Sequence, residues 1–442
     1  MTTIRQQVAR LAGGQASSRS MLEQARERAQ AAAELNAIAH VDWPQAAAAA
    51  DALDARARAG NPVGPLHGVP VTVKDLFHVE GMPLQAGTRA KLPGIPREAS
   101  VVARLRDAGA LVFAKTNMHE IALGATGENP WTGDVKNPRD PRRQAGGSSS
   151  GSAVAVAVGI GAASVGSDTG GSVRIPAAFC GVVGFKPTFG AVPLDGALPL
   201  SWTCDHAGPL ARCVADAALL YEVIAQRQVR HGAVARRPRL AIPAQWLRPR
   251  LSAAVRESFE RVVASLRGDA DVAEVDTPTL PLAWEAYTPI VRAEAAYVHR
   301  AALAAGGEGF SDAVSAPLRA GSELSAQRYL DAMSQREQVR SELDALLAGH
   351  DALILPTSAV APPLRGQTDV DVAAGRMTVR EAVLGQTLPF SLVGLPALSL
   401  PAGDADGLPM GLQVVGRRDR DASLLALCGW LESSLAGSAL SR

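Results

Sequence analysis

Two glycine- and serine-rich segments are the first places where this sequence could do chemistry. Residues 146–152 read Gly-Gly-Ser-Ser-Ser-Gly-Ser, and residues 167–176 read Ser-Asp-Thr-Gly-Gly-Ser-Val-Arg-Ile-Pro. Glycine permits positive φ angles and close backbone approach, so the run from Thr169 to Ser172 can aim successive N–H groups at one oxygen. That geometry suits an oxyanion hole.

Other glycine motifs fit these segments less well. No lysine follows either turn as a phosphate-binding loop requires, and Ser164 stands where a dinucleotide fingerprint starting at Gly159 needs its third glycine. Residues 147–151 match G-x-S-x-G, but the residues before them are loop-like, whereas a nucleophile elbow follows a strand. On glycine content alone, both turns could equally be tight corners around a buried helix.

Lysine is scarce in this chain, which narrows the search for a base. Arginine does not lose its proton in a protein, whereas a buried lysine can be neutral near pH 7. Five of the 44 basic residues are lysine and the other 39 are arginine. The lysines are Lys74, Lys91, Lys115, Lys136 and Lys186.

The sequence resembles the amidase signature family over most of its length, through motifs that are spread along the chain. They are Gly68 to Asp75, Lys115 to Met118, Asn137-Pro138, Gly146 to Ser152, Asp168 to Lys186, Asp205 to Leu210, Gly394 to Ala397, and Gly411 to Gly416.

The resemblance implies a catalytic triad of serine, a second serine that follows a cis peptide bond, and lysine. Matched position by position, the nucleophile is Ser172, the bridging cis-serine is Ser148, and the lysine is Lys74. It also implies that the N–H groups of Thr169, Gly170, Gly171 and Ser172 form the oxyanion hole.

The implied triad is chemically coherent. A serine hydroxyl needs a base to remove its proton. Lys74 ends an apolar, strand-like run, so burial would lower its pKa, although Asp75 would oppose this if its side chain turned inward. Ser148 would then relay the proton between Ser172 and Lys74 and later protonate the leaving amine.

Residues around the triad are expected to play supporting parts. Asp168 and Arg174 flank the nucleophile, and we expect an ion pair between them that holds the turn, with or without a part in catalysis. The side chains of Lys115 and Lys186 are expected to carry surface charge. His119 and His206 have no second ligand at helical spacing, so we expect no metal and no cofactor.

Three positions depart from the family's usual pattern. Ser150 stands where glycine is usual, Ser391 where asparagine is common, and Cys204 where leucine is common. None of these changes removes a catalytic group, although Ser150 adds a hydroxyl beside the relay.

The elements that must position these residues alternate between helix and strand, which predicts an α/β fold. We expect a single large domain with the amidase signature fold, a mixed β-sheet core surrounded by helices. Residues 1–60 are expected to form a helical segment packed on the core, and residues 61–442 the amidase domain. Residues 124–147 are expected to be a long functional loop, and residues 226–238 a surface insertion.

Periodicity and turn residues predict the individual elements. Helices are expected at residues 17–35, 43–59, 99–108, 212–225, 251–266, 284–305 and 323–347, and strands at residues 68–75, 111–114, 240–242, 353–355, 397–400 and 412–415.

Composition excludes several classes of protein. The chain has 442 residues, 47% hydrophobic and 20% charged, with a formal net charge of +1, so neither disorder nor a general attraction to nucleic acid is expected. Its four scattered cysteines form no CxxC pair, and the consistently apolar part of its longest uncharged stretch, residues 144–167, is too short to span a membrane. The start lacks the pattern of a secretory signal, so we expect a cytoplasmic location.

We therefore predict an amidase that hydrolyses a small-molecule carboxamide through an acyl-enzyme on Ser172. The alternative is the glutaminase (A) subunit of an aminoacyl-tRNA amidotransferase, although residues 189–193, Phe-Gly-Ala-Val-Pro, depart from the segment Tyr-Gly-Arg-Val-Ser that such subunits usually carry. A catalytically silent binding protein is less favoured, because all three triad positions are filled. The sequence leaves open whether the protein forms a homodimer.

Residues 284–390 and the loop around Trp131 are expected to shape the substrate pocket. The aromatic residues Trp284, Tyr287, Tyr297, Phe310 and Tyr329 are expected either to line it or to pack in the core.

Overall fold

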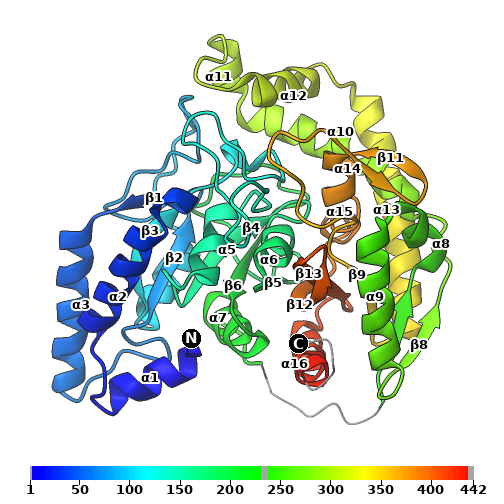
Figure 1. Ribbon diagram of the computed structural model, residues 1–442. Helices are drawn as coiled ribbons and strands as arrows, with labels where there is room; N and C mark the ends of the chain where they lie inside the picture. The colour runs from blue at the N-terminus through cyan, green and yellow to red at the C-terminus, as the bar shows by residue number, and fades with distance from the viewer. Residues whose placement is uncertain (1, 230–236, 437–442) are drawn as a thin grey trace.

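The molecule is organised around one long mixed β-sheet, seen in the computed structural model of Figure 1, which describes residues 2–229 and 237–436. From one edge to the other, the strands are β1 (Ile38–Val41), β3 (Leu111–Thr116), β2 (Pro70–Lys74), β4 (Ala163–Asp168), β6 (His206–Ala211), β5 (Val183–Lys186), β12 (Ala397–Ala405), β13 (Leu408–Val415), β9 (Ala352–Pro356), β7 (Arg239–Ile242) and β8 (Asp271–Glu274). This large mixed sheet with flanking helices confirms the predicted fold class.

The sheet changes strand direction along its width. Strand β2 runs parallel to both β3 and β4, and β7 runs parallel to β8 and β9, whereas the strands from β4 through β6, β5, β12 and β13 to β9 pair antiparallel. Because β2 and β4 are parallel neighbours, both strands end at the same edge of the sheet. Lys74 and Asp168, their last residues, are therefore brought to one place.

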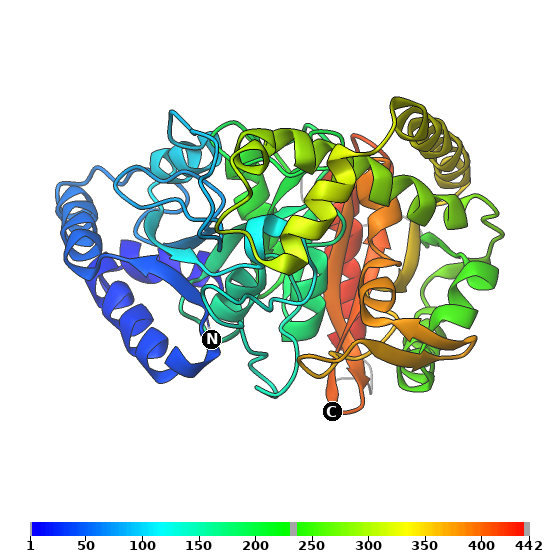
Figure 2. The same cartoon turned by 90° about the horizontal axis from the view of Figure 1, so that it is seen from above.

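Helices cover the sheet, and others form a layer at its end, as Figure 2 shows from above. The longer helices are α1 (Ile4–Ala12), α2 (Ser18–Ala31), α3 (Trp43–Arg58), α4 (Ser100–Asp107), α5 (Ser150–Ala157), α7 (Val214–Ala225), α9 (Ala253–Leu266), α10 (Leu280–Val298), α12 (Asp312–Ser322), α13 (Ala326–Gly349) and α16 (Asp421–Ala436). The shorter ones are α6 (Arg174–Cys180), α8 (Ala244–Leu247), α11 (Arg300–Ala304), α14 (Val379–Leu384) and α15 (Leu388–Leu392). A two-stranded hairpin, β10 (Asp369–Val372) and β11 (Gly375–Thr378), precedes α14.

Two groups of helices pack on the centre of the sheet. Helices α5 and α6 contact each other, and α5 packs on β2 and β4 while α6 packs on β5, β12 and β13. Helix α7 contacts α4 and α16 and packs on β4, β5 and β6. Along β2, Val71 and Val73 are completely buried in the larger hydrophobic cluster, which includes residues of α4 and α7. Side chains alternate between the faces of a strand, so Thr72 and Lys74 point to the opposite face, toward α5.

Local chemistry accounts for the elements that the sequence predicted. Strand β2 is rich in β-branched residues, which suit a buried strand. Helix α2 begins with a capping box of Ser17 and Ser20, and the side chain of Asp42 caps α3 by accepting from the Gln45 N–H. Residues 124–147 contain no helix or named strand, so the predicted loop is confirmed.

Some expected elements differ in the structure. Residues 1–60 are not entirely helical, because β1 pairs antiparallel with β3 and so adds an edge strand to the sheet. The helix expected at residues 284–305 is divided into α10 and α11, which meet at His299. Strands β4, β5, β6 and β8 and helix α12 were not predicted. The expected insertion at residues 226–238 lies largely outside the described residues.

Candidate active site

Lys74 and Ser148 are in direct contact inside the protein. Strand β2 ends at Lys74, whose Nζ lies 2.6 Å from Oγ of Ser148 and 2.8 Å from Oγ of Ser167. The Gly147–Ser148 peptide bond is cis, and Lys74 and Ser148 are fully buried. The amine of Lys74 therefore has two hydroxyl partners in a site closed to solvent.

Burial changes the proton affinity of this amine. It lowers the pKa of Lys74 from 10.5 to about 7, although the negative charges of Asp168 and Asp205 act in the opposite direction. Asp75 does not turn toward Lys74, because its carboxylate pairs with Lys115 at 2.7 Å. With a pKa of about 7, a large fraction of the Lys74 side chain is neutral at physiological pH.

Ser172 belongs to the turn that connects β4 to α6. The N–H of Ser149 donates to the carbonyl oxygen of Ser172 at 3.2 Å, and Oγ of Ser149 donates to the carbonyl oxygen of Ser167 at 3.0 Å. These two bonds join the two glycine-rich segments side by side. Ser172 is 4% exposed and lines a cavity, whereas Lys74 and Ser148 are fully buried and are not among its lining residues.

The turn before Ser172 holds its peptide groups in a fixed arrangement. Oγ1 of Thr169 donates to Asp205 at 2.6 Å, and Oγ1 of Thr387 donates to the carbonyl oxygen of Gly170 at 2.6 Å. Gly171 has a φ of 143°, and a Cβ there would lie 2.2 Å from Oγ1 of Thr387. Only glycine fits this position.

Three consecutive N–H groups of this turn make no hydrogen bond to the described residues. Those of Gly170, Gly171 and Ser172 have no hydrogen-bond acceptor in the part of the chain that the structure describes. Backbone donors without an internal acceptor beside a cavity can bind an oxygen that becomes negative during a reaction.

An ion pair between Asp168 and Arg174 connects the two ends of the turn, as expected. Nη2 of Arg174 lies 2.8 Å from Oδ1 of Asp168, and its Nε lies 3.0 Å from Oδ2. Burial by itself would raise the pKa of Asp168, but the positive charge and hydrogen bonds of Arg174 have the larger effect and hold that pKa below its usual value. The remaining three donors of the guanidinium reach Thr387, Ser391 and Gln413, so all five are satisfied.

A cavity of about 310 Å³ opens in front of Ser172. Its walls come from the loop around residues 122–128 and from α10, α12 and α14. Tyr287, Thr288, Val291, Arg292, Arg380, Val383 and Leu384 are among the lining residues. The expectation that residues 284–390 shape the pocket agrees with this lining.

The aromatic residues named from the sequence have different positions. Tyr287 lines the cavity, but Tyr297 is 58% exposed on the surface, and Phe310 is buried against His299. Trp131 is not among the lining residues, and its Nε1 donates to Glu120 at 2.9 Å. Of the loop around it, Thr126 and Glu128 reach the cavity.

Neither histidine near the motifs is set up as the base. Burial, together with the neighbouring Lys74, lowers the pKa of His119 to about 4, although this side chain lines the cavity. Nδ1 of His206 lies 2.7 Å from the carbonyl oxygen of Cys204 and 3.1 Å from that of Asp168, so this nitrogen carries the proton. Within the described ranges, no three His, Cys, Asp or Glu side chains come together as a metal site.

The prediction that Lys115 and Lys186 carry surface charge is wrong. Both side chains are fully buried. Lys115 pairs with Asp75 and donates to the carbonyl oxygen of Pro83, whereas Nζ of Lys186 lies 2.5 Å from the carbonyl oxygen of Leu395. Each amine replaces its lost hydration with internal acceptors.

Two residues at the site were not assigned a part from the sequence. Ser167 is the second partner of Lys74, and Asp205 holds Thr169 while also accepting the N–H groups of Leu200 and Ser201. Ser167 directly precedes Asp168 on β4, so the parallel pairing of β2 and β4 would have revealed it. Asp205 lies in a quoted motif, but only the packing shows its contact.

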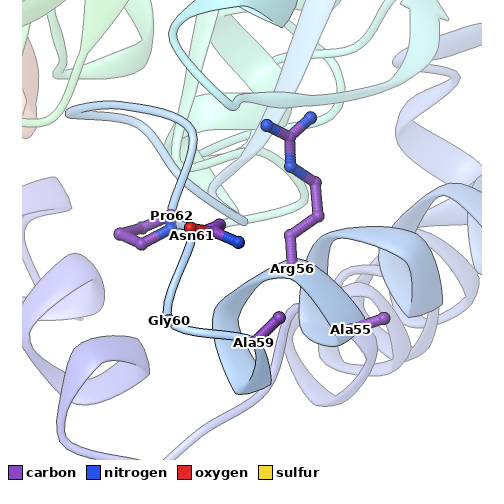
Figure 3. Close-up of a pocket in the computed structure, with 6 residues that line it drawn as sticks. All are labelled: Ala55, Arg56, Ala59, Gly60, Asn61 and Pro62. Carbon is purple, nitrogen blue, oxygen red and sulfur yellow. The ribbon is translucent and has the colours of Figure 1, made fainter.

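A second hollow shares no lining residue with this cavity. It is lined by Ala55, Arg56, Ala59, Gly60, Asn61 and Pro62, at the end of α3 and in the loop that follows (Figure 3). None of the proposed catalytic side chains lines it.

Comparisons with known proteins give a consistent picture. The family model described as Amidase matches residues 20–425. The chain is 37% identical over 420 residues to the glutamyl-tRNA(Gln) amidotransferase (A) subunit of Symbiobacterium thermophilum, covering 85% of this chain and 84% of that protein. The corresponding subunit of Halorhodospira halophila is 36% identical over 465 residues, covering 96% and 95% of the two chains.

The fold has close solved relatives as well. One crystal structure, described as that of an amidase, superimposes with a TM-score of 0.96 at 51% sequence identity and covers 98% of this chain and 100% of its own. Among the described residues, no helix combines the length and the apolar character that crossing a membrane requires.

Proposed function

Because this chain belongs to the amidase signature family and is therefore an enzyme that acts on amide C–N bonds, we propose that it hydrolyses a small carboxamide through an acyl-enzyme on Ser172. In this proposal Lys74 is the base, Ser148 relays the proton, and the N–H groups of residues 169–172 bind the oxyanion. The observation that carries it is the contact of 2.6 Å between the buried amine of Lys74 and the hydroxyl of Ser148.

Acylation proceeds with a balanced transfer of protons. Oγ of Ser172 attacks the carbonyl carbon while its proton passes to Oγ of Ser148, whose own proton passes to the neutral Nζ of Lys74. The carbonyl oxygen becomes negative and accepts from the free N–H groups of the turn. When the C–N bond breaks, Ser148 protonates the leaving nitrogen and takes a proton back from Lys74.

Deacylation repeats these steps with water. Water attacks the acyl carbon, gives its proton to the same relay, and the Ser172 oxygen regains a proton when the carboxylic acid leaves. Lys74 ends the cycle neutral. Ser167 supports this role because it accepts a hydrogen bond from Lys74 in either protonation state, at 2.8 Å.

Covalent labelling tests the nucleophile directly. A fluorophosphonate probe should label the protein at Ser172, and Ser172→Ala should abolish both labelling and amide hydrolysis. Ser150→Ala is the matched control, because it removes a nearby buried hydroxyl that has no role in the proposed transfer. A folded wild-type protein that resists the probe and hydrolyses no amide would rule out the proposal.

The second candidate is the glutaminase subunit of an aminoacyl-tRNA amidotransferase. Curated relatives at 36–37% identity carry the name of such a subunit, and this favours the assignment over a free-standing amidase. The neighbour at 51% identity is described only as an amidase. Both candidates share the proposed chemistry at Ser172, so they differ in substrate and in assembly.

Substrate and partners together distinguish these two candidates. A glutaminase subunit should release ammonia from glutamine and should co-purify with other subunits from its native cell, and its activity should rise when they are bound. A free-standing amidase should act alone on simple amides at full rate. Glutamine turnover that depends on co-purified chains would therefore assign the subunit function.

A further inference from the structure

We propose that Arg292 and Arg380 form a carboxylate-binding subsite, so that the enzyme prefers small amides that carry a negative charge at the end remote from the scissile bond. The proposal rests on the proposed function, since it concerns the acyl side of the same cavity. Arg292 lies on α10 and Arg380 on α14, and both line the cavity onto which Ser172 opens.

Neither arginine has an acidic partner in the part of the chain that the structure describes. Within residues 2–229 and 237–436, no ion pair or hydrogen bond of either guanidinium is present. The nearest acidic neighbour in sequence, Glu381, is held by Arg250 at 3.0 Å. Two unpaired arginines on one cavity repel each other, and an anion placed between them removes that repulsion.

Arg380 lines the cavity and contacts an aromatic ring. Its guanidinium carbon lies 4.9 Å from the centre of the Trp284 ring, within the range of a cation–π contact. Such a contact leaves the edge of a guanidinium free, and its N–H groups match the two oxygens of a carboxylate. Arg292 is half-buried on the neighbouring helix, and so it meets the cavity with less water around it.

The rest of the lining does not cancel this charge. Glu128 is the one acidic residue among the lining residues, and its Oε1 already accepts from the N–H of Gly366 at 2.6 Å. His119, with its pKa near 4, is neutral at pH 7. The cavity therefore carries a net positive charge at its wall.

Size and polarity of the cavity define the rest of the substrate. A volume of about 310 Å³ is at the small end of ligand sites. Val291, Val383 and Leu384 line it with aliphatic side chains. These features together fit a monoamide of a short dicarboxylic acid, with its carboxylate at the arginines, its methylene groups on the aliphatic wall, and its amide at Ser172.

Matched substrates and variants test this assignment. Succinamate and glutaramate each carry a carboxylate, and butyramide and pentanamide are neutral amides of similar length. The wild type should show a kcat/KM for the carboxylates at least tenfold above that for the neutral amides. Arg292→Gln and Arg380→Gln should each lower kcat/KM for the carboxylates about ten- to hundredfold, mainly through KM, and leave the neutral amides within about twofold.

The control is Arg376→Gln, which removes one exposed positive charge from β11 but does not line the cavity. It should change neither substrate class. Fluorophosphonate labelling at Ser172 should be retained in all three variants, which shows that each is folded and that its nucleophile is active.

The two proposals fail in different ways. A wild type that labels and hydrolyses neutral amides at least as well as carboxylates would overturn the subsite and leave the proposed function standing. Equal losses on both substrate classes in the arginine variants would also overturn it, because a purely structural role acts on both. Absence of labelling and of all amide turnover would instead overturn the function itself.

Discussion

At the scale of single residues, the site depends on how burial acts on one amine. Lys74 is fully enclosed and its pKa falls to about 7, whereas the fully buried Lys115 is paired with a carboxylate. The difference between these lysines lies in their partners, since Lys74 meets two neutral hydroxyls. An amine that is desolvated without a counter-ion is the one able to accept a proton.

The first prediction concerns the pH dependence that follows from the proposed role of Lys74 as the base. Because only neutral Lys74 accepts a proton, kcat/KM for an amide should rise about tenfold per pH unit below pH 7 and level off above it. Lys74→Ala should lower amide turnover about 10²- to 10⁴-fold and remove this acidic limb. Steady-state rates between pH 5.5 and 9 provide the measurement.

Lys91→Ala is the matched control, because Lys91 is exposed. It should leave the profile unchanged. Circular dichroism should show that Lys74→Ala is folded. Near-normal amide turnover by this variant at pH 7.5 would contradict the assignment of the base.

The second prediction concerns the relay at Ser148. Ser148→Ala should impair amides far more than activated esters, because a nitrophenolate leaving group departs without being protonated whereas an amine does not. Rates with a matched pair, an anilide and the nitrophenyl ester of the same acid, provide the measurement. Equal losses on both substrates would argue against proton transfer through Ser148.

At the scale of elements, one arginine joins four parts of the fold. Arg174 at the start of α6 binds Asp168 at the end of β4, Ser391 in α15, and Gln413 in β13. The turn that carries Ser172 lies between Asp168 and Arg174. The position of Ser172 therefore depends on contacts between segments that are distant in sequence.

The third prediction concerns the stability that this junction provides. Arg174→Gln leaves the buried Asp168 carboxylate without its counter-ion, which typically costs about 3–5 kcal/mol of unfolding free energy. Urea unfolding followed by circular dichroism measures the loss. Arg142→Gln breaks an exposed pair with Asp140 and should have no measurable effect. Equal midpoints for the two variants would disprove the structural role of Arg174.

At the scale of the whole molecule, buried lysines connect the active site to overall stability. Burial lowers the pKa of Lys74 to about 7, and it also lowers the pKa of Lys186 well below 10.5. An unfolded lysine stays protonated up to pH 10.5, so unfolding takes up protons between the folded and unfolded pKa values. The contribution of these two lysines to the unfolding free energy therefore rises with pH between their folded and unfolded pKa values.

The fourth prediction isolates the part due to Lys74. Between pH 7 and 8.5 its contribution should approach a slope of about 1.4 kcal/mol per pH unit, the value for one proton. Lys74→Met should flatten the measured slope by about this amount, and Lys91→Met should not. The pH window stops at 8.5 because the cysteines contribute above it. Burial raises the pKa of Cys180, Cys204 and Cys428 in the folded protein, whereas their thiols ionise near pH 9 in the unfolded chain. This difference lowers the unfolding free energy as the pH rises, opposite to the effect of Lys74. Parallel slopes for Lys74→Met and wild type would contradict the lowered pKa.

Residues close together in sequence were the ones that could be predicted. The strand that carries Lys74, the helix capped by Ser17 and the glycine turn before Ser172 each follow from the chemistry of neighbouring residues. The ion pair between Asp168 and Arg174 spans a single turn, and it was also anticipated. The assignment of Ser148 came from the resemblance, because spacing alone left its turn open to a purely structural interpretation.

Tertiary structure decided the environment of each group. It buried Lys115 and Lys186 where surface charge was expected, paired Lys74 with Ser167, and left Arg292 and Arg380 without counter-ions on the cavity. Sequence sets which chemical groups are present and the local backbone that carries them. Desolvation and charge pairing depend on segments that meet only when the sheet and its helices have assembled. For this reason the structure alone determined which lysines are buried and which arginines line the cavity.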